Sequence, residues 1–197
     1  MGKYKIIALI GEAGSGKDYI MKQVLAAAPD MFNEIISCTT RPMREGEQEG
    51  VNYYYLTKEQ FAEKLYNNEM LESTIFNDWY YGTSIDSLSK DKPNIGVFNP
   101  AGIYSLKDRP DIDLVVYRIC CSSKTRLLRQ LHRENDPDVD EIIRRFMTDT
   151  KDFADLGFSY TKLPNELNLD APLAVNQILL HGIGATEQGQ KWINNLS

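Results

Sequence analysis

The sequence predicts an α/β fold in which a parallel sheet is flanked by helices. Apolar strand-like runs and amphipathic helical segments alternate along most of the 197 residues, as they do in chains built from βαβ units. A glycine-rich turn at residues 11–18 separates the first apolar run from the first helical segment. Between residues 41 and 88 the alternation gives way to short strand-like runs around one helical segment. This change predicts a small insert with its own mixed α+β structure.

Apolar spacing predicts the individual elements in chain order. In the core we expect strands at residues 5–10, 35–36, 94–98 and 114–120, and helices at 17–28, 123–133, 139–153 and 170–181. In the insert we expect a helix at 58–66 and strands at 53–57, 71–75 and 79–82. Ser122 or Ser123 can cap the helix that follows it, and Asp136-Pro137-Asp138 separates that helix from the next.

Composition limits the class of protein. Hydrophobic residues make up 42% of the chain and charged residues 25%, as in an ordinary globular protein. A net charge of −6 argues against a general nucleic-acid binder, which is usually basic. The three cysteines, Cys38, Cys120 and Cys121, lack metal-binding spacing, and the N-terminal apolar run is too short for a signal peptide or a membrane span. We therefore expect a cytoplasmic protein with reduced thiols and neither nucleic-acid nor membrane partners.

The glycine-rich turn has the features of a phosphate-binding loop. It reads Gly11-Glu-Ala-Gly-Ser-Gly-Lys-Asp18, and it follows an apolar strand and precedes a helix, which is the context that the GxxxxGK[ST] motif requires. Glycines let backbone N–H groups surround a phosphate, and the helix N-terminus adds positive potential. Lys17 would reach the β- and γ-phosphates of ATP. The expected ATP contacts are Gly11, Ala13, Gly14, Ser15, Gly16, Lys17 and Asp18.

Asp18 departs from that motif, because it stands where a serine or threonine hydroxyl normally contacts Mg²⁺. A carboxylate is also a hard oxygen ligand, so we expect Asp18 to bind Mg²⁺ directly or through water.

A second group of polar residues lies in the insert. Arg41 and Arg44 are three residues apart, Tyr53 follows shortly after, and Tyr81 and Thr83 come later in the chain. Arginine side chains match phosphate oxygens well, so these groups could converge on one phosphate. Taken alone, the segment could equally be a solvated charged loop.

The stretch SCTTRPMREGEQEGVNYYYLTKEQF, followed in register by NNEMLE and YYGTS, resembles the signature of the guanylate kinase family. The resemblance covers roughly residues 4–180. It implies a P-loop kinase core at residues 1–37 and 89–185 with a helical lid at about 126–150, a nucleoside-monophosphate-binding insert at 38–88, and a C-terminal tail at 186–197. It also implies transfer of the γ-phosphoryl group of ATP, with Mg²⁺, to GMP or dGMP.

The resemblance assigns roles by position. Ser37, Arg41, Arg44, Tyr53 and Tyr81 match contacts to and near the acceptor phosphate. Glu72, Ser37 and Thr83 match the residues that read guanine, and Glu47 matches a supporting carboxylate. The chain departs from the family at Val97 and Asn99, where aspartates are usual. We expect Asn99 to face the base as a neutral amide, so that guanine is preferred by a smaller margin than two carboxylates would give.

The lid carries an arginine series. Arg126, Arg129 and Arg133 have the spacing of one helix face, and Arg144 and Arg145 follow. The resemblance assigns the clamp on the triphosphate to Arg129, Arg133 and Arg145, which join Lys17 and Arg44 as the expected catalytic residues. A solvated helix with ion pairs to neighbouring acids is the alternative. Asn165 lies near the family's adenine-side asparagine.

Two further interpretations stay open. The same fold could phosphorylate another acceptor, such as a different deoxynucleoside monophosphate or a sugar phosphate, and Val97 and Asn99 favour this possibility. A non-catalytic, guanylate-kinase-like binding module is the other, and the intact Gly-Ser-Gly-Lys17 segment argues against it. In each case the expected partners are small molecules, above all nucleotides, and the expected assembly is a monomer or a homodimer.

Overall fold

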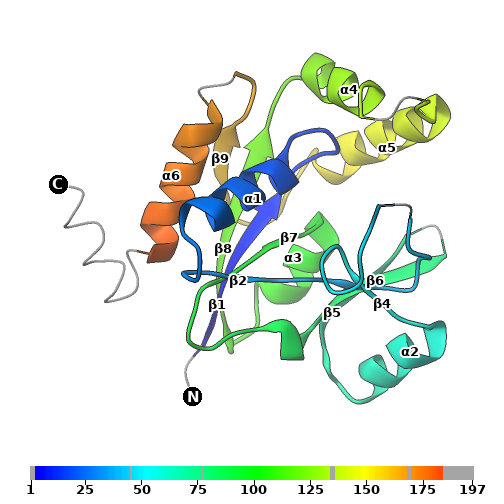
Figure 1. Cartoon of the computed structure of the whole chain (residues 1–197), viewed down its shortest axis with the longest axis vertical. Helices are drawn as coiled ribbons and strands as arrows, with labels where there is room; N and C mark the ends of the chain where they lie inside the picture. Colours follow the sequence, from blue (N-terminus) through cyan, green and yellow to red (C-terminus); the bar gives the residue numbers. More distant parts are fainter. Residues whose placement is uncertain (1–2, 45, 77, 134–135, 168–169, 184–197) are drawn as a thin grey trace.

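The computed structural model describes residues 3–44, 46–76, 78–133, 136–167 and 170–183 (Figure 1). In this part of the chain the larger sheet has five strands in the order β2-β7-β1-β8-β9, and each adjacent pair is parallel. The strands are β1 (Tyr4–Ile10), β2 (Asn33–Glu34), β7 (Asn94–Val97), β8 (Ile112–Cys120) and β9 (Thr161–Pro164). The predicted α/β class with a parallel sheet flanked by helices is confirmed.

Helices cover both faces of the central strand β1. Ile7 and Leu9 pack in one core cluster with α1 (Lys17–Ala27) and α6 (Asp170–Ile183). Ile6, Ala8 and Ile10 point the other way, into a second cluster that includes α3 (Pro100–Leu106). Because both faces are covered, every residue from Ile6 to Ile10 is fully buried, which explains why the strand is a continuous apolar run rather than an alternating one.

The insert forms a smaller sheet in the order β4-β3-β6-β5. Its strands are β3 (Cys38–Thr39), β4 (Tyr54–Tyr55), β5 (Met70–Phe76) and β6 (Trp79–Ser84), with helix α2 at Lys58–Tyr66 and the short 3-10 helix η1 at Ile85–Ser87. Thr57 and Gln60 begin α2 with a reciprocal capping box. Phe61 holds α2 on the sheet, with its ring 5.4 Å from that of Tyr80.

Helices α4 (Ser123–Leu131) and α5 (Val139–Asp152) lie in the segment where the sequence predicts a lid. Ser122 caps α4 by accepting from the N–H of Thr125, as the sequence predicts, and Asp138 caps α5 in the same way through Glu141. In Figure 1 helices α4 and α5 (upper right) and the insert (lower right) lie on the same side of the core.

Several boundaries differ from the sequence prediction. The strand expected at 35–36 lies at Asn33–Glu34, although the N–H of Ile35 still donates to the carbonyl of Ile95. The strand expected at 53–57 is limited to Tyr54–Tyr55, and α4 ends at Leu131 rather than at 133. The prediction missed α3 and β9 altogether. The tail expected at 186–197 lies outside the described residues. Among the residues that are described, we find no helix long and apolar enough to cross a membrane.

Candidate active site

The phosphate-binding loop joins the end of β1 to the start of α1. Gly14 and Gly16 adopt φ values of +80° and +90°, which side chains disfavour. Space is also short: a Cβ atom on Gly14 would lie 2.5 Å from the carbonyl oxygen of Arg126, and one on Gly16 would collide with the side-chain amide of Asn165. Lys17 begins α1 and Asp18 is exposed in its first turn. The loop therefore presents backbone N–H groups and a lysine at one helix N-terminus, as the sequence predicts.

Two residues hold the loop from behind. Asn165 follows β9, is only 4% exposed, and donates from Nδ2 to the carbonyl oxygen of Ser15 at 2.8 Å. Arg129 donates from Nη2 to the carbonyl oxygen of Asn165 at 2.9 Å and from Nη1 to that of Ser15 at 3.3 Å. The structure thus brings both predicted residues to the loop, where they bind its backbone. A contact between Asn165 and adenine stays a prediction.

Arg126 also reaches the loop, although the sequence assignment left it out of the clamp. It is 4% exposed, and its Nε donates to the carbonyl oxygen of Ala13 at 3.1 Å. Its guanidinium lies 4.5 Å from the ring centre of Phe146 on α5. The spacing of Arg126 and Arg129 on one helical face indicated that they act together, but only the packing of α4 against the loop shows that Arg126 is the more buried of the two.

The other two predicted lid arginines, Arg133 and Arg145, have different surroundings. Arg133 comes after the end of α4 and is exposed, so it does not share a helix face with Arg126 and Arg129. Arg145 donates to Glu141 at 2.7 Å, and the adjacent Arg144 binds the same carboxylate, which holds the pKa of Glu141 at about 2. These ion pairs along α5 are of the kind expected from the alternative interpretation, in which the arginines lie on a solvated helix and pair with neighbouring acids. A role for Arg133 and Arg145 at the triphosphate stays a prediction.

The carboxylate of Glu47 organises residues 41–44 and 46–55, which we call the acceptor loop after their predicted role. Arg41 donates to both of its oxygens, at 2.8 and 3.0 Å, in a bidentate ion pair. The backbone N–H of Arg44 and the hydroxyl of Tyr55 each donate to it at 2.8 Å. The hydrogen bonds from Arg41 lower the pKa of Glu47 to about 2, while burial and the bond to Glu47 raise the pKa of Tyr55 to about 12. Glu47 is therefore ionised at neutral pH and fixes the direction of the Arg41 guanidinium.

Tyr53 packs against both Arg41 and Tyr81. Its ring lies 5.5 Å from the guanidinium carbon of Arg41 and 6.1 Å from the ring of Tyr81. Burial raises the pKa of Tyr53, and the nearby carboxylate of Asp18 adds to the rise. Tyr53, Arg41 and Tyr81 thus form one cluster of polar and aromatic side chains in the insert.

The carboxylate of Glu72 lies in the insert, where β5 pairs with β6. Thr83 is fully buried and its hydroxyl donates to Glu72 Oε1 at 2.9 Å. Burial raises the pKa of Glu72. Its other oxygen, Oε2, lies 3.3 Å from the position that a Cβ atom on Gly102 would take. Ser37 lies just before β3. Its carbonyl oxygen accepts a hydrogen bond from the N–H of Tyr54 in β4.

Asn99 lies near Glu72 in an orientation that the sequence did not reveal. Its Oδ1 accepts from the N–H of Gly102 at 2.7 Å and caps α3. Glu72 Oε2 and Asn99 Oδ1 both lie within 3.4 Å of the Cβ position of Gly102, so the two side chains flank one point. Because the oxygen is used by the cap, the amide NH₂ is the end of exposed Asn99 that remains for a ligand.

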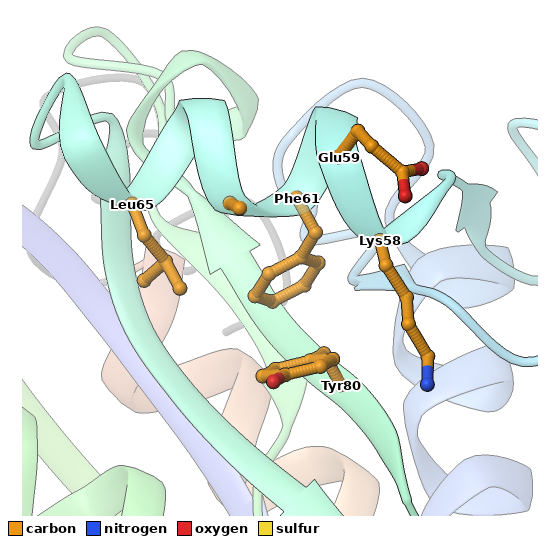
Figure 2. Close-up of a pocket in the computed structure, with 6 residues that line it drawn as sticks. Lys58, Glu59, Phe61, Leu65 and Tyr80 are labelled. Atoms are coloured by element: carbon orange, nitrogen blue, oxygen red, sulfur yellow. The ribbon is translucent and has the colours of Figure 1, made fainter.

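A further cavity of about 320 Å³ lies between α2 and β6 (Figure 2). Figure 2 shows Phe61 and Leu65 pointing toward Tyr80, with Lys58 and Glu59 at one end. None of the predicted site residues lines it.

Together, the parallel sheet, the phosphate-binding loop at its first strand and the arginine-bearing insert define a P-loop phosphotransferase type of architecture. The family model for guanylate kinase matches residues 3–171, and the chain therefore belongs to the guanylate kinase family.

Individual relatives agree with this membership. The chain is 30% identical over 181 residues to a guanylate kinase of Mycoplasma pneumoniae, covering 89% of this chain and 75% of that protein. It is 35% identical over 112 residues to the guanylate kinase of Helicobacter hepaticus, covering 55% of this chain and 56% of that protein, and a match to the guanylate kinase of Prochlorococcus marinus covers 46% of that protein. The chain thus spans about half the length of these last two relatives.

The fold agrees with a solved structure as well. A guanylate kinase from Anaplasma phagocytophilum superposes with a TM-score of 0.65 at 17% identity, covering 92% of this chain and 88% of that one.

Proposed function

We propose that this chain is a guanylate kinase, which transfers the γ-phosphoryl group of ATP to GMP or dGMP in the presence of Mg²⁺. The observation that carries the proposal is the glycine-rich loop between β1 and α1 in a chain whose residues 3–171 match the guanylate kinase family model. Lys17 and Asp18 of the Gly11–Asp18 loop begin α1, while Arg41, Tyr53 and Tyr81 gather in the insert. A phosphoryl donor and a phosphorylated acceptor would meet between them.

The chemistry follows from charge and position. Phosphoryl transfer spreads negative charge over the moving oxygens, and catalysis is mainly positioning and electrostatic stabilisation. Lys17 and the loop N–H groups would hold the donor phosphates. Arg41, held in one direction by Glu47, would fix the acceptor phosphate, and Arg44 would lie beside the transferred group.

Mg²⁺ fits the donor chemistry of the site. In the described residues no three His, Cys, Asp or Glu side chains gather into a metal cage. Mg²⁺ commonly uses one or two carboxylates together with substrate phosphates, and exposed Asp18 at the start of α1 offers such a carboxylate. Bound there, the ion would neutralise charge on the triphosphate.

The acceptor base is selected by hydrogen-bond polarity. Glu72 can accept from N1–H and N2–H of guanine, and it is already oriented by Thr83. Adenine would turn a ring acceptor toward the same carboxylate. Of the donor and acceptor groups that the neutral amide of Asn99 offers, the donor NH₂ is the one proposed to face the base, since the oxygen caps α3. A donor at this place can reach an acceptor atom of guanine, so we propose that guanine remains the preferred base.

The exposed Asn99 amide also favours the alternative of another acceptor nucleotide, because it departs from the usual aspartate. We further propose that residues 38–88 close over the acceptor, that the lid at about 126–150 closes over ATP, and that the enzyme acts in the cytoplasm as a monomer or homodimer.

A coupled assay of ADP release over GMP, dGMP, AMP and dTMP tests the function. We expect turnover with the guanine nucleotides at least tenfold above the others. Faster turnover with AMP or dTMP would assign a different acceptor, and no ADP release with any acceptor would favour a binding module.

A further inference from the structure

One backbone N–H of the phosphate-binding loop is already bound to an anion of the protein itself. The carboxylate of Asp149, on lid helix α5, accepts from the N–H of Ala13 at 2.6 Å. Ala13 lies inside the glycine-rich loop, whose N–H groups are the donors that a triphosphate needs. A carboxylate and a phosphate oxygen compete for the same kind of donor.

Arg126 completes this contact from the other lid helix. Its Nε donates to the carbonyl oxygen of Ala13, and its Nη2 lies 3.4 Å from Asp149 Oδ2. Both polar groups of Ala13 are therefore bound by the lid, the N–H by α5 and the carbonyl oxygen by α4. Glu12, 3.7 Å from Arg126 and 2.9 Å from Arg118 of β8, ties the preceding loop residue to the same group of charges.

We propose that Asp149 is an internal stand-in for phosphate, which holds helix α5 against the loop and is displaced from the Ala13 N–H when the triphosphate binds. This inference rests on the proposed function, because it takes ATP as the ligand of the loop. Asp149 and Arg126 then act as a latch between α5 and the loop. Because the triphosphate must displace Asp149 to bind, the latch lowers the affinity of the loop for the triphosphate.

The surroundings of Asp149 suit a contact that a stronger anion can replace. Burial raises the pKa of its carboxyl group, so the ionised form is held at a cost in free energy. The Ala13 N–H, Lys17 and Arg126 offset part of that cost, whereas Glu12 adds to it. A triphosphate brings more negative charge to Lys17 and the loop than one carboxylate does. Once displaced, Asp149 can return to water and leave Arg126 with a single carboxylate partner, Glu12.

The decisive variant is Asp149→Asn, which keeps an acceptor oxygen at the same place but removes the charge. The probe is the β,γ-imido analogue of ATP with Mg²⁺, and its affinity is measured by calorimetry. We expect Asp149→Asn to bind the analogue about fivefold more tightly than the parent, since hydrogen bonds to neutral groups are weaker than those to charged ones. Asp149→Ala should tighten binding by about tenfold or more. Asp152→Asn, exposed on the same helix, is the matched control and should bind as the parent does.

A second measurement reports on the contact directly. The amide proton of Ala13 should shift upfield in unliganded Asp149→Asn relative to the parent, and this difference should disappear once the analogue is bound. Unchanged or weaker analogue binding by Asp149→Asn would overturn the latch, because Asp149 would then support the loop in its nucleotide-binding shape. An Ala13 amide shift that is the same in both unliganded proteins would overturn the contact alone. A parent and a variant that both fail to bind the analogue would overturn the proposed function together with the latch. If Asp149→Ala does not fold, Asp149→Asn decides the outcome.

Discussion

Replacing Glu47 by glutamine removes the charge that organises the acceptor loop. In the folded protein this carboxylate accepts two hydrogen bonds from Arg41, one from the N–H of Arg44 and one from Tyr55. The fall of its pKa from 4.5 to about 2 corresponds to about 3 kcal/mol. Because the side chain is 19% exposed, screening by water reduces the expected loss of unfolding free energy in Glu47→Gln to about 1–2 kcal/mol.

The pH dependence of unfolding isolates the charge. A carboxylate whose folded pKa is lowered contributes stability above its unfolded pKa, here about 4.5, and loses it as the pH falls toward about 2. Urea titrations at pH 7, 4 and 3 should therefore show the parent approaching Glu47→Gln in stability as the pH falls. The KM for GMP should rise in the variant because Arg41 is no longer held in one direction.

Glu49→Gln is the matched control for this experiment. Glu49 accepts from the backbone N–H of Tyr55 at 3.0 Å, so the variant changes a carboxylate in the same loop without removing a partner of Arg41. We expect it to keep the parent's stability to within about 0.5 kcal/mol. The reasoning would be refuted if Glu47→Gln and the parent had the same free energy of unfolding at pH 7. It would also be refuted if both proteins lost the same amount of unfolding free energy between pH 7 and pH 3.

Three further substitutions test the roles assigned to the site. Lys17→Ala should lower kcat by about 10²–10³ with unchanged thermal unfolding, and unchanged turnover would remove the phosphate-binding loop from the mechanism. Asp18→Ala should raise the Mg²⁺ concentration needed for half-maximal activity, whereas Asp18→Ser should retain much of the activity. If Asp18→Ala requires the same Mg²⁺ concentration as the parent, the carboxylate is not near the metal. Glu72→Gln should lower kcat/KM for GMP by about tenfold or more and leave AMP nearly unaffected, and an equal loss for both would remove Glu72 from base selection. Since burial raises the pKa of Glu72 above 4.5, the acid limb of kcat/KM for GMP in the parent should lie above that pH and should be absent in Glu72→Gln.

Much of the core followed from local sequence patterns. The apolar run at Ile6–Ile10 could only be a strand covered on both faces, and the glycines around Lys17 required a tight turn before a helix. Helix α3 was not predicted because Asn99, Pro100 and Gly102 have the composition of a turn. In the structure Asn99 caps the helix and Pro100 is its first residue. Strand β9 is four residues long with only Leu163 buried, too little apolar spacing to be recognised.

The site was only partly accessible from the sequence. The resemblance to a family supplied Glu72 and Thr83, and strand register then placed them opposite one another. Helical spacing grouped Arg126 with Arg129 but could not say which would reach the loop, because that depends on how α4 packs on residues 13–15. The contact of Asp149 with Ala13 joins residues that are 136 positions apart in the chain. A local sequence pattern therefore cannot predict it.

The most direct test of the account is to follow the transferred group itself. ATP labelled with ³²P in the γ position is incubated with GMP, Mg²⁺ and the protein, with Lys17→Ala as the control. The account predicts that the label appears in the β-phosphate of GDP, at a rate equal to ADP formation, and that Lys17→Ala reduces both about equally. Label released only as inorganic phosphate, or transferred faster to AMP or dTMP than to GMP, would contradict it.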